Sequence, residues 1–316
     1  MATLELNLAT DVRLNSVLIA TDFSAASEKA LRHTLSIARY YGAKLYIMHV
    51  VSSAGLTMAG PDAIAQATTA ALRDTTLTER ELIASGALRD LRHRMIVSHG
   101  DIWTQLQAVI QGESIDLVVT GTHGRTGLKK LVLGSVAEQI FRHACCRVLT
   151  VGPFSPADAQ LSGHEAPRPV LFATDFSEAS LNALPHAASL ANLRKAKLVL
   201  LHVLSPVPEV NGSRWYTAAD VMEMRAKAEP AARSRMQQLV ANLHLGVEPL
   251  SMARWGAPAE GILHAAEDLN AEAIIMGLTY RSHIGTISHL PWSTAYDVVC
   301  QALCPVLTVR TENPQE

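Results

Sequence analysis

The chain has 316 residues, of which 48% are hydrophobic and 18% charged, and its formal net charge is -2. This length suffices for two ordinary domains, and so small a charge gives no broad electrostatic attraction to nucleic acid. No apolar run approaches the roughly 18 residues of a membrane-spanning helix. The N-terminal segment contains Glu5 and Asp11 and lacks the layout of a signal peptide, so the cytoplasm is the predicted location.

In the first half of the chain, short β-branched runs alternate with stretches of helical spacing. Strands are expected at residues 16–21, 46–51, 95–98, 115–120 and 147–151. A first helix is expected to open at Ser24, and others at 62–91, loosened near Gly86, at 102–110 and at 135–143. Strands that alternate with helices predict a parallel sheet covered on both faces.

The second half of the chain repeats the first. ATDFSAAS at residues 20–27 returns as ATDFSEAS at 173–180, and LYIMHVV at 45–51 returns as LVLLHVL at 198–204, so that His49 matches His202. The offset grows only from 153 residues (20 to 173) to 158 residues (146 to 304). Residues 153–168 are rich in proline and small polar residues and are typical of a linker. The predicted domains are therefore 1–152 and 169–316.

Residues 115–136 read IDLVVTGTHGRTGLKKLVLGSV, which is a buried strand, a basic glycine loop and the start of a helix. Glycines let a ligand approach the main chain closely, and a helix that starts at Gly134 and Ser135, with Ser135 as a plausible N-cap, would point unpaired N–H groups at the same place. Together with Arg125, Lys129 and Lys130, this pattern predicts a phosphate site. A mobile glycine loop with no ligand is the alternative.

Two widespread phosphate motifs are excluded, because the loop matches neither G-x4-G-K-[ST] nor G-x-G-x-x-G. The spacing that is present, Gly121-x2-Gly124-x9-Gly134-Ser135, resembles the ATP-binding signature of the universal stress protein family. That family also has an Asp after its first strand, which Asp22 supplies. The resemblance extends over both copies. It implies two tandem flavodoxin-like, Rossmann-like α/β domains, each a doubly wound five-stranded parallel sheet of order 3-2-1-4-5.

In that order the sheet reverses between its first and fourth strands, and doubly wound sheets bind ligands at such a point. Asp22 and the Gly121 loop end these two strands. By resemblance, Asp22 and the backbone near Val50 would contact adenosine, while the loop and the following helix would hold the phosphates. Magnesium would accompany the triphosphate. The residues assigned to the nucleotide site are Thr21, Asp22, Val50, Gly121, His123, Gly124, Arg125, Gly134, Ser135 and Val136; none is assigned a catalytic or metal-ligating role.

The second copy departs from this signature. Gly277 matches Gly121, but Tyr280 replaces Gly124, and Pro291-Trp292-Ser293 stands where Leu133-Gly134-Ser135 does, after a loop that is two residues longer. An indole would occupy the volume of a phosphate, and a side chain at a glycine of positive φ would add backbone strain. Asp175 remains and is interpreted as a helix cap. We therefore expect one ATP per chain, held by the first copy.

Two cysteines precede the last predicted strand of each copy, and all four are expected to be small buried residues rather than metal ligands or a redox pair. The favoured function is an ATP-binding regulatory or stress-response protein with slow or no hydrolysis. The alternatives are a nucleotide-dependent transferase or hydrolase on the same fold, and a module that binds a partner or an apolar small molecule through the second copy. The apolar end strands predict pairing of the two copies within the chain. A homodimer is left open, and neither nucleic acid nor a membrane is expected as a partner.

Overall fold

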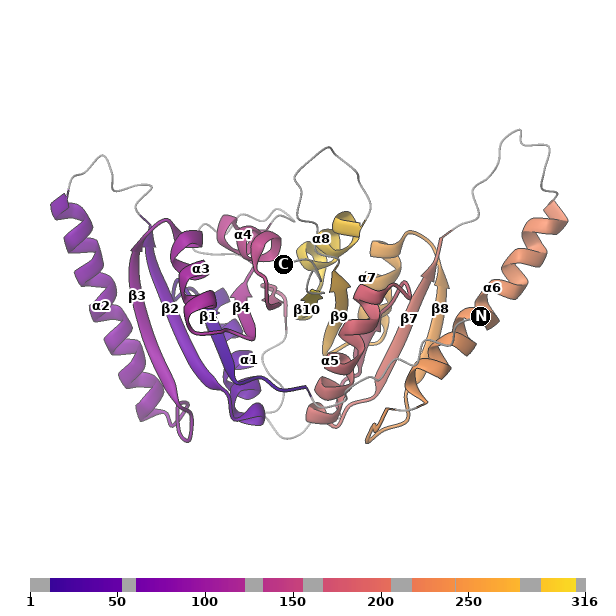
Figure 1. The fold of residues 1–316 in the computed structure, drawn as a ribbon, viewed down its shortest axis with the longest axis horizontal. Coiled ribbons are helices and arrows are strands. Elements are labelled where there is room, and N and C mark those ends of the chain that lie inside the picture. Colours follow the sequence, from indigo (N-terminus) through magenta and orange to yellow (C-terminus); the bar gives the residue numbers. More distant parts are fainter. Residues whose placement is uncertain are drawn as a thin grey trace. The chain divides into compact units, whose positions relative to one another are not determined.

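The computed structural model describes residues 12–52, 61–122, 133–155, 167–205, 218–241, 243–278 and 291–310. Apart from Val12, they belong to two compact units, one within Arg13–His164 and one within Glu165–Glu316 (Figure 1). Among the described residues, no helix has the length and apolar character needed to cross a membrane.

Unit one alternates strands and helices from beginning to end. Its sheet has the order β3-β2-β1-β4-β5, and every described pairing in it is parallel. Its elements are β1 (Ser16–Ala20), α1 (Ala25–Tyr41), β2 (Lys44–Ser52), α2 (Pro61–Ala84), β3 (His93–Gly100), α3 (Ile102–Gly112), β4 (Leu117–Gly121), α4 (Ser135–His143) and β5 (Arg147–Val151). This confirms the predicted sheet order, and the bounds of α4 and β5 are those predicted.

The expected helix over residues 62–91 is too long. The helix α2 ends at Ala84, and turns follow over residues 85–90. Gly86 and Asp90 have φ of 74° and 63° there, a left-handed conformation that cannot continue an α-helix. The strands β2 and β3 also extend beyond their predicted apolar cores, because ladder pairing continues as far as Ser52 and Gly100.

Unit two repeats this architecture. Its sheet order, β8-β7-β6-β9-β10, is that of unit one, and its described pairings are also parallel. Its elements are β6 (Val170–Ala173), α5 (Glu178–Arg194), β7 (Leu198–Leu204), α6 (Ala218–Val240), β8 (Leu250–Trp255), α7 (Pro258–Asp268), β9 (Ala273–Leu278), α8 (Pro291–Gln301) and β10 (Val306–Arg310).

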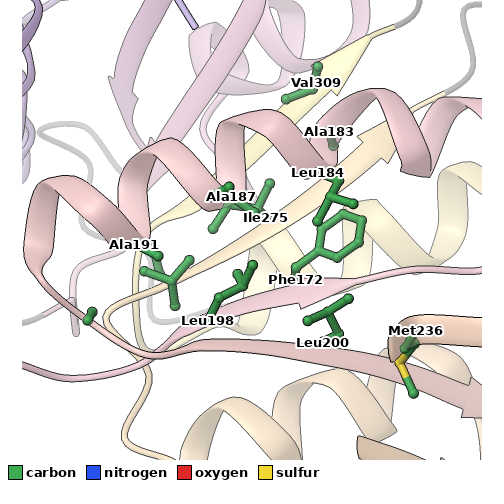
Figure 2. Close-up of a cluster of buried hydrophobic side chains, with 14 of the residues drawn as sticks. Phe172, Ala183, Leu184, Ala187, Ala191, Leu198, Leu200, Met236, Ile275 and Val309 are labelled. Atoms are coloured by element: carbon green, nitrogen blue, oxygen red, sulfur yellow. The ribbon is translucent and has the colours of Figure 1, made fainter. Parts of the chain in front are cut away.

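Alternate side chains of each sheet pack against helices on opposite faces, as expected for buried parallel strands. In unit one, Leu18, Met48 and Val118 of the sheet pack with Leu106 of α3 and Ile140 of α4. Figure 2 shows the core on the opposite face of the sheet in unit two, where sheet residues face the helix α5 and Met236 of α6. The cores therefore fix the strands whose carboxyl ends form the sites described below.

Candidate functional sites at the carboxyl ends of the strands

A crevice of about 160 Å³ opens in unit one at the ends of β1 and β4, where the strand order reverses. Most of the residues assigned to a nucleotide from sequence lie together in its lining, directly after β1, within β2 and β4, and at the start of α4. These residues are Thr21, Asp22, Val50, Gly121, Gly134, Ser135 and Val136. The other three, His123, Gly124 and Arg125, lie outside the described residues.

Asp22 is held rigidly at the start of the helix α1. Its Oδ1 accepts hydrogen bonds from the Ser24 amide at 3.0 Å and from the Ser27 hydroxyl at 2.5 Å. Ser24 is the N-cap of α1, and its side chain accepts from the Ser27 amide. Asp22 therefore braces the first turn of α1 and lines the crevice at the same time, so a cap and a ligand contact are not exclusive roles.

His49 of β2 is hydrogen-bonded to the residue that follows β1, directly before Asp22. Its Nδ1 lies 2.8 Å from the Thr21 carbonyl oxygen, to which it can only donate. Its ring also packs against Phe23, with centroids 5.1 Å apart, and Phe23 has a φ of 58°. The neutral ring then carries its proton on Nδ1 and offers Nε2 as an acceptor. His49 lines the crevice although its sequence signal, the repeated His-Val, had not been assigned to the site.

The helix α4 is capped one residue earlier than expected. Gly134 is the N-cap and Ser135 the first helical residue, so Ser135 is not the cap that the sequence suggested. The Gly134 amide donates to the Thr122 carbonyl at 2.8 Å. The φ of Gly134 is -61°, a value open to any residue, so the strain argument for this glycine is wrong. A side chain at Gly134 would instead take up space at the start of α4.

Several lining residues were missed from sequence. Ile102 and Leu106 reach the crevice from the first turns of α3, and Ser27 reaches it from α1. The repetition of the second serine in ATDFSxxS could have identified Ser27. Ile102 and Leu106 have only ordinary amphipathic spacing, which gives no sign of a ligand site.

Unit two has a crevice at the equivalent place, and it is larger, at about 450 Å³. The contacts that His49 makes with Thr21 and Phe23 in unit one are repeated in unit two. The Nδ1 of His202 lies 2.8 Å from the Thr174 carbonyl oxygen, and the His202 ring packs on Phe176 at 4.6 Å. Asp175 accepts from the amide and the hydroxyl of Ser177, the N-cap of α5, at 2.9 and 2.6 Å. Asp175 was predicted to cap this helix, but the N-cap is Ser177, and Asp175 instead accepts hydrogen bonds from that cap.

Burial would raise the pKa of Asp175, but the hydrogen bonds that its carboxylate accepts from Ser177 and Ser180 outweigh burial and hold the pKa below its ordinary value. The carboxylate is thus firmly ionised at neutral pH. This fixes a negative charge at the rim of the second crevice.

Gly277 lies at the end of β9, in the position that matches Gly121. A Cβ built on it would lie 1.9 Å from the carbonyl oxygen of Ala179 in α5. Helix and strand therefore touch through the main chain, and only glycine fits. Close helix packing, not access for a ligand, is the physical reason for a glycine here.

The four cysteines differ in exposure. Cys145 is exposed and Cys304 is buried, and none of the four forms a disulfide. The expectation that all are small buried residues is therefore wrong for Cys145. Burial raises the pKa of Cys304 to about 12. Within the described part of the chain, no three His, Cys, Asp or Glu residues gather where they could hold a metal ion.

Comparison with known proteins identifies the family. The universal stress protein family model matches residues 14–152 and again residues 167–310. The chain belongs to the universal stress protein family.

One curated relative and two solved structures illustrate what the chain is similar to. A universal stress protein of Thermus aquaticus is 30% identical over 141 residues, which are 45% of this chain and 97% of the relative. A solved universal stress protein of Archaeoglobus fulgidus has a TM-score of 0.67 at 21% identity, and covers 96% of this chain and 98% of its own. Another solved universal stress protein, described in complex with cAMP, is 21% identical with a TM-score of 0.36, over 47% of this chain and all of its own.

Proposed function

We propose that this universal stress protein binds one ATP in the crevice of unit one and acts as an ATP-dependent regulatory protein in the stress response, with slow or no hydrolysis. The observation that carries the proposal is the convergence of Thr21, Asp22, Val50, Gly121, Gly134, Ser135 and Val136 on one crevice. Asp22 and the glycines had been assigned from two separate sequence features, an aspartate after the first strand and a glycine pattern after the fourth, and Val50 from the family resemblance.

The donors at the start of α4 suit a phosphate group. The first amides of a helix have no intrahelical acceptor, and Ser135, Val136 and Ala137 of that first turn all line the crevice. The helix dipole adds only about 0.3–2 kcal/mol, whereas micromolar affinity requires roughly 8 kcal/mol. The proposal therefore also needs contacts to the base and ribose, and basic side chains such as Arg125.

The other end of the crevice suits an adenosine. Asp22 would accept hydrogen bonds from ribose hydroxyls, and His49 Nε2 adds an acceptor beside Val50. The cavity is smaller than the roughly 300–1,000 Å³ of typical small-molecule pockets. It would thus take only part of the nucleotide, with the phosphates against the start of α4. Magnesium, bound mainly by phosphate oxygens, needs few protein carboxylates, and among the described lining residues Asp22 carries the one carboxylate.

The test is titration calorimetry of the full chain with ATP and magnesium, and with cAMP as a second nucleotide. We expect one ATP per chain. Asp22→Asn keeps an oxygen acceptor for Ser24 and Ser27 but removes the charge, and should weaken ATP binding by about 1–3 kcal/mol. Alanine would also remove the brace on α1, so it is the poorer choice. The matched variant Asp175→Asn should leave ATP affinity unchanged, and Gly134→Trp should abolish binding.

Two equivalent ATP sites, or the same affinity for Asp22→Asn as for the unchanged protein, would overturn the proposal. Phosphate release, measured in the same preparations, decides between a binding protein and a hydrolase. Turnover that exceeds about 1 per second, within the usual range of enzymes, would favour the hydrolase.

A further inference from the structure

The larger crevice of unit two has the properties of a small-molecule site. Its volume of about 450 Å³ lies within the roughly 300–1,000 Å³ of ligand pockets. Apolar side chains from β7, α7 and β9 line it, including Leu201, Val203, Ile262, Met276 and Leu278. We propose that this crevice binds an uncharged, mainly apolar small molecule that carries one hydrogen-bond donor, and that it does not bind a nucleotide.

The pair of His202 and Thr174, which matches His49 and Thr21 of unit one, is the reason that the ligand is expected to carry a hydrogen-bond donor. His202 lines the crevice and donates its Nδ1–H to the Thr174 carbonyl oxygen at 2.8 Å. The neutral ring therefore presents Nε2 as an acceptor. The hydroxyls of Thr174 and Ser180 bond to each other at 2.9 Å, and Asp175 is engaged by Ser177. An N–H or O–H group of a ligand would thus find its acceptor at His202.

The part that holds phosphate in the proposal for unit one is altered in unit two. The helix α8 begins at Pro291, which matches Leu133, whereas α4 begins at Ser135. Two residues displace the helix start by about 3 Å. Thr294, which matches Val136, is then the fourth residue of its helix where Val136 is the second, and Pro291 has no N–H at all. Unit two therefore offers fewer open amides at the crevice.

The wall beside the helix start has become apolar. Thr120 and Thr122 of unit one are matched by Met276 and Leu278, both of which line the second crevice and are buried. No lysine or arginine is found among the described residues of this lining, and the ionised Asp175 lies at its rim. An anion would meet a negative charge without a compensating cation, whereas an uncharged ring system would bury apolar surface.

The experiment is a fluorescence titration of the full chain with N-phenylnaphthylamine, an uncharged apolar fluorophore with a single N–H donor. We expect saturable binding at one site per chain. Val203→Phe narrows the crevice and should lower the affinity at least about tenfold. The matched variant Val50→Phe narrows the crevice of unit one instead and should leave probe binding unchanged. Saturating ATP should not displace the probe.

A second variant guards against misfolding of Val203→Phe. Met276→Thr combined with Leu278→Thr installs the residues that unit one carries at these positions, and should weaken the probe about tenfold through loss of apolar contact. The inference is overturned if the probe does not bind, if neither folded variant weakens it, if Val50→Phe abolishes it, or if ATP displaces it. These results do not depend on whether ATP binds to unit one.

Discussion

Replacing Gly277 with alanine should destabilise unit two severely. The new Cβ would lie 1.9 Å from the Ala179 oxygen, 2.2 Å from the Ala179 carbonyl carbon and 2.5 Å from the Ser180 Cα. All three are main-chain atoms of α5, which cannot turn away as a flexible side chain would. An ordinary contact requires about 3.5–4.0 Å, so β9 and α5 must separate by more than 1 Å.

The helix α5 has no room to yield, because Ala179, Ala183 and Leu184 are buried along the face that packs on the sheet. Overpacking of a core typically costs 1–3 kcal/mol and occasionally more, and contact between main-chain atoms belongs at the upper end, about 3 kcal/mol. For a domain of this size, that lowers the melting temperature by roughly 6–12 °C.

The matched control is Gly112→Ala at the end of α3. A Cβ there meets nothing within 4 Å, and Gly112 has no left-handed φ. This variant should be neutral or stabilising by up to about 1 kcal/mol. Differential scanning calorimetry of both variants gives the comparison. If Gly277→Ala melted within 2 °C of the unchanged protein, with a native circular dichroism spectrum, the packing explanation of this glycine would be wrong.

The remaining predictions concern the thiols, acid stability and the end strands. A thiol reagent at neutral pH should modify Cys145 rapidly and Cys304 only after unfolding, because Cys145 is exposed while Cys304 is buried with a pKa of about 12; mass mapping that finds Cys304 modified first would contradict this. The lowered pKa of Asp175 stabilises the fold above the ordinary pKa of about 3.9, and this contribution is lost as pH falls through the folded-state pKa. Urea midpoints of Asp175→Asn and the unchanged protein should therefore differ at pH 7 and converge as the pH falls below the folded-state pKa, and a constant difference would argue against the shift. Residues 1–152 alone should dimerise through β5, the end strand of unit one, since an apolar edge left open invites pairing; a monomer in solution scattering would refute that pairing.

The sequence by itself determined the repeat, the alternation of strands and helices and, through the resemblance, the sheet order. These features rest on short-range signals. A β-branched run, a serine cap before Ala25 or a glycine after Tyr41 acts within a few residues of its own position. The sequence also identified both strand ends that form the first crevice, because parallel strands bring their carboxyl ends to one edge of the sheet.

The tertiary structure decided what those residues do there. Three contacts show this: the hydrogen bond between Asp22 and Ser27, the one between His49 and Thr21, and the close approach of Gly277 to α5. The sequence patterns at these residues do not specify the geometry of the contacts. The relative volumes of the two crevices could not be predicted from the sequence either. A cavity is the space left between side chains from four or five elements, so its volume depends on packing across the whole unit, which no local pattern specifies.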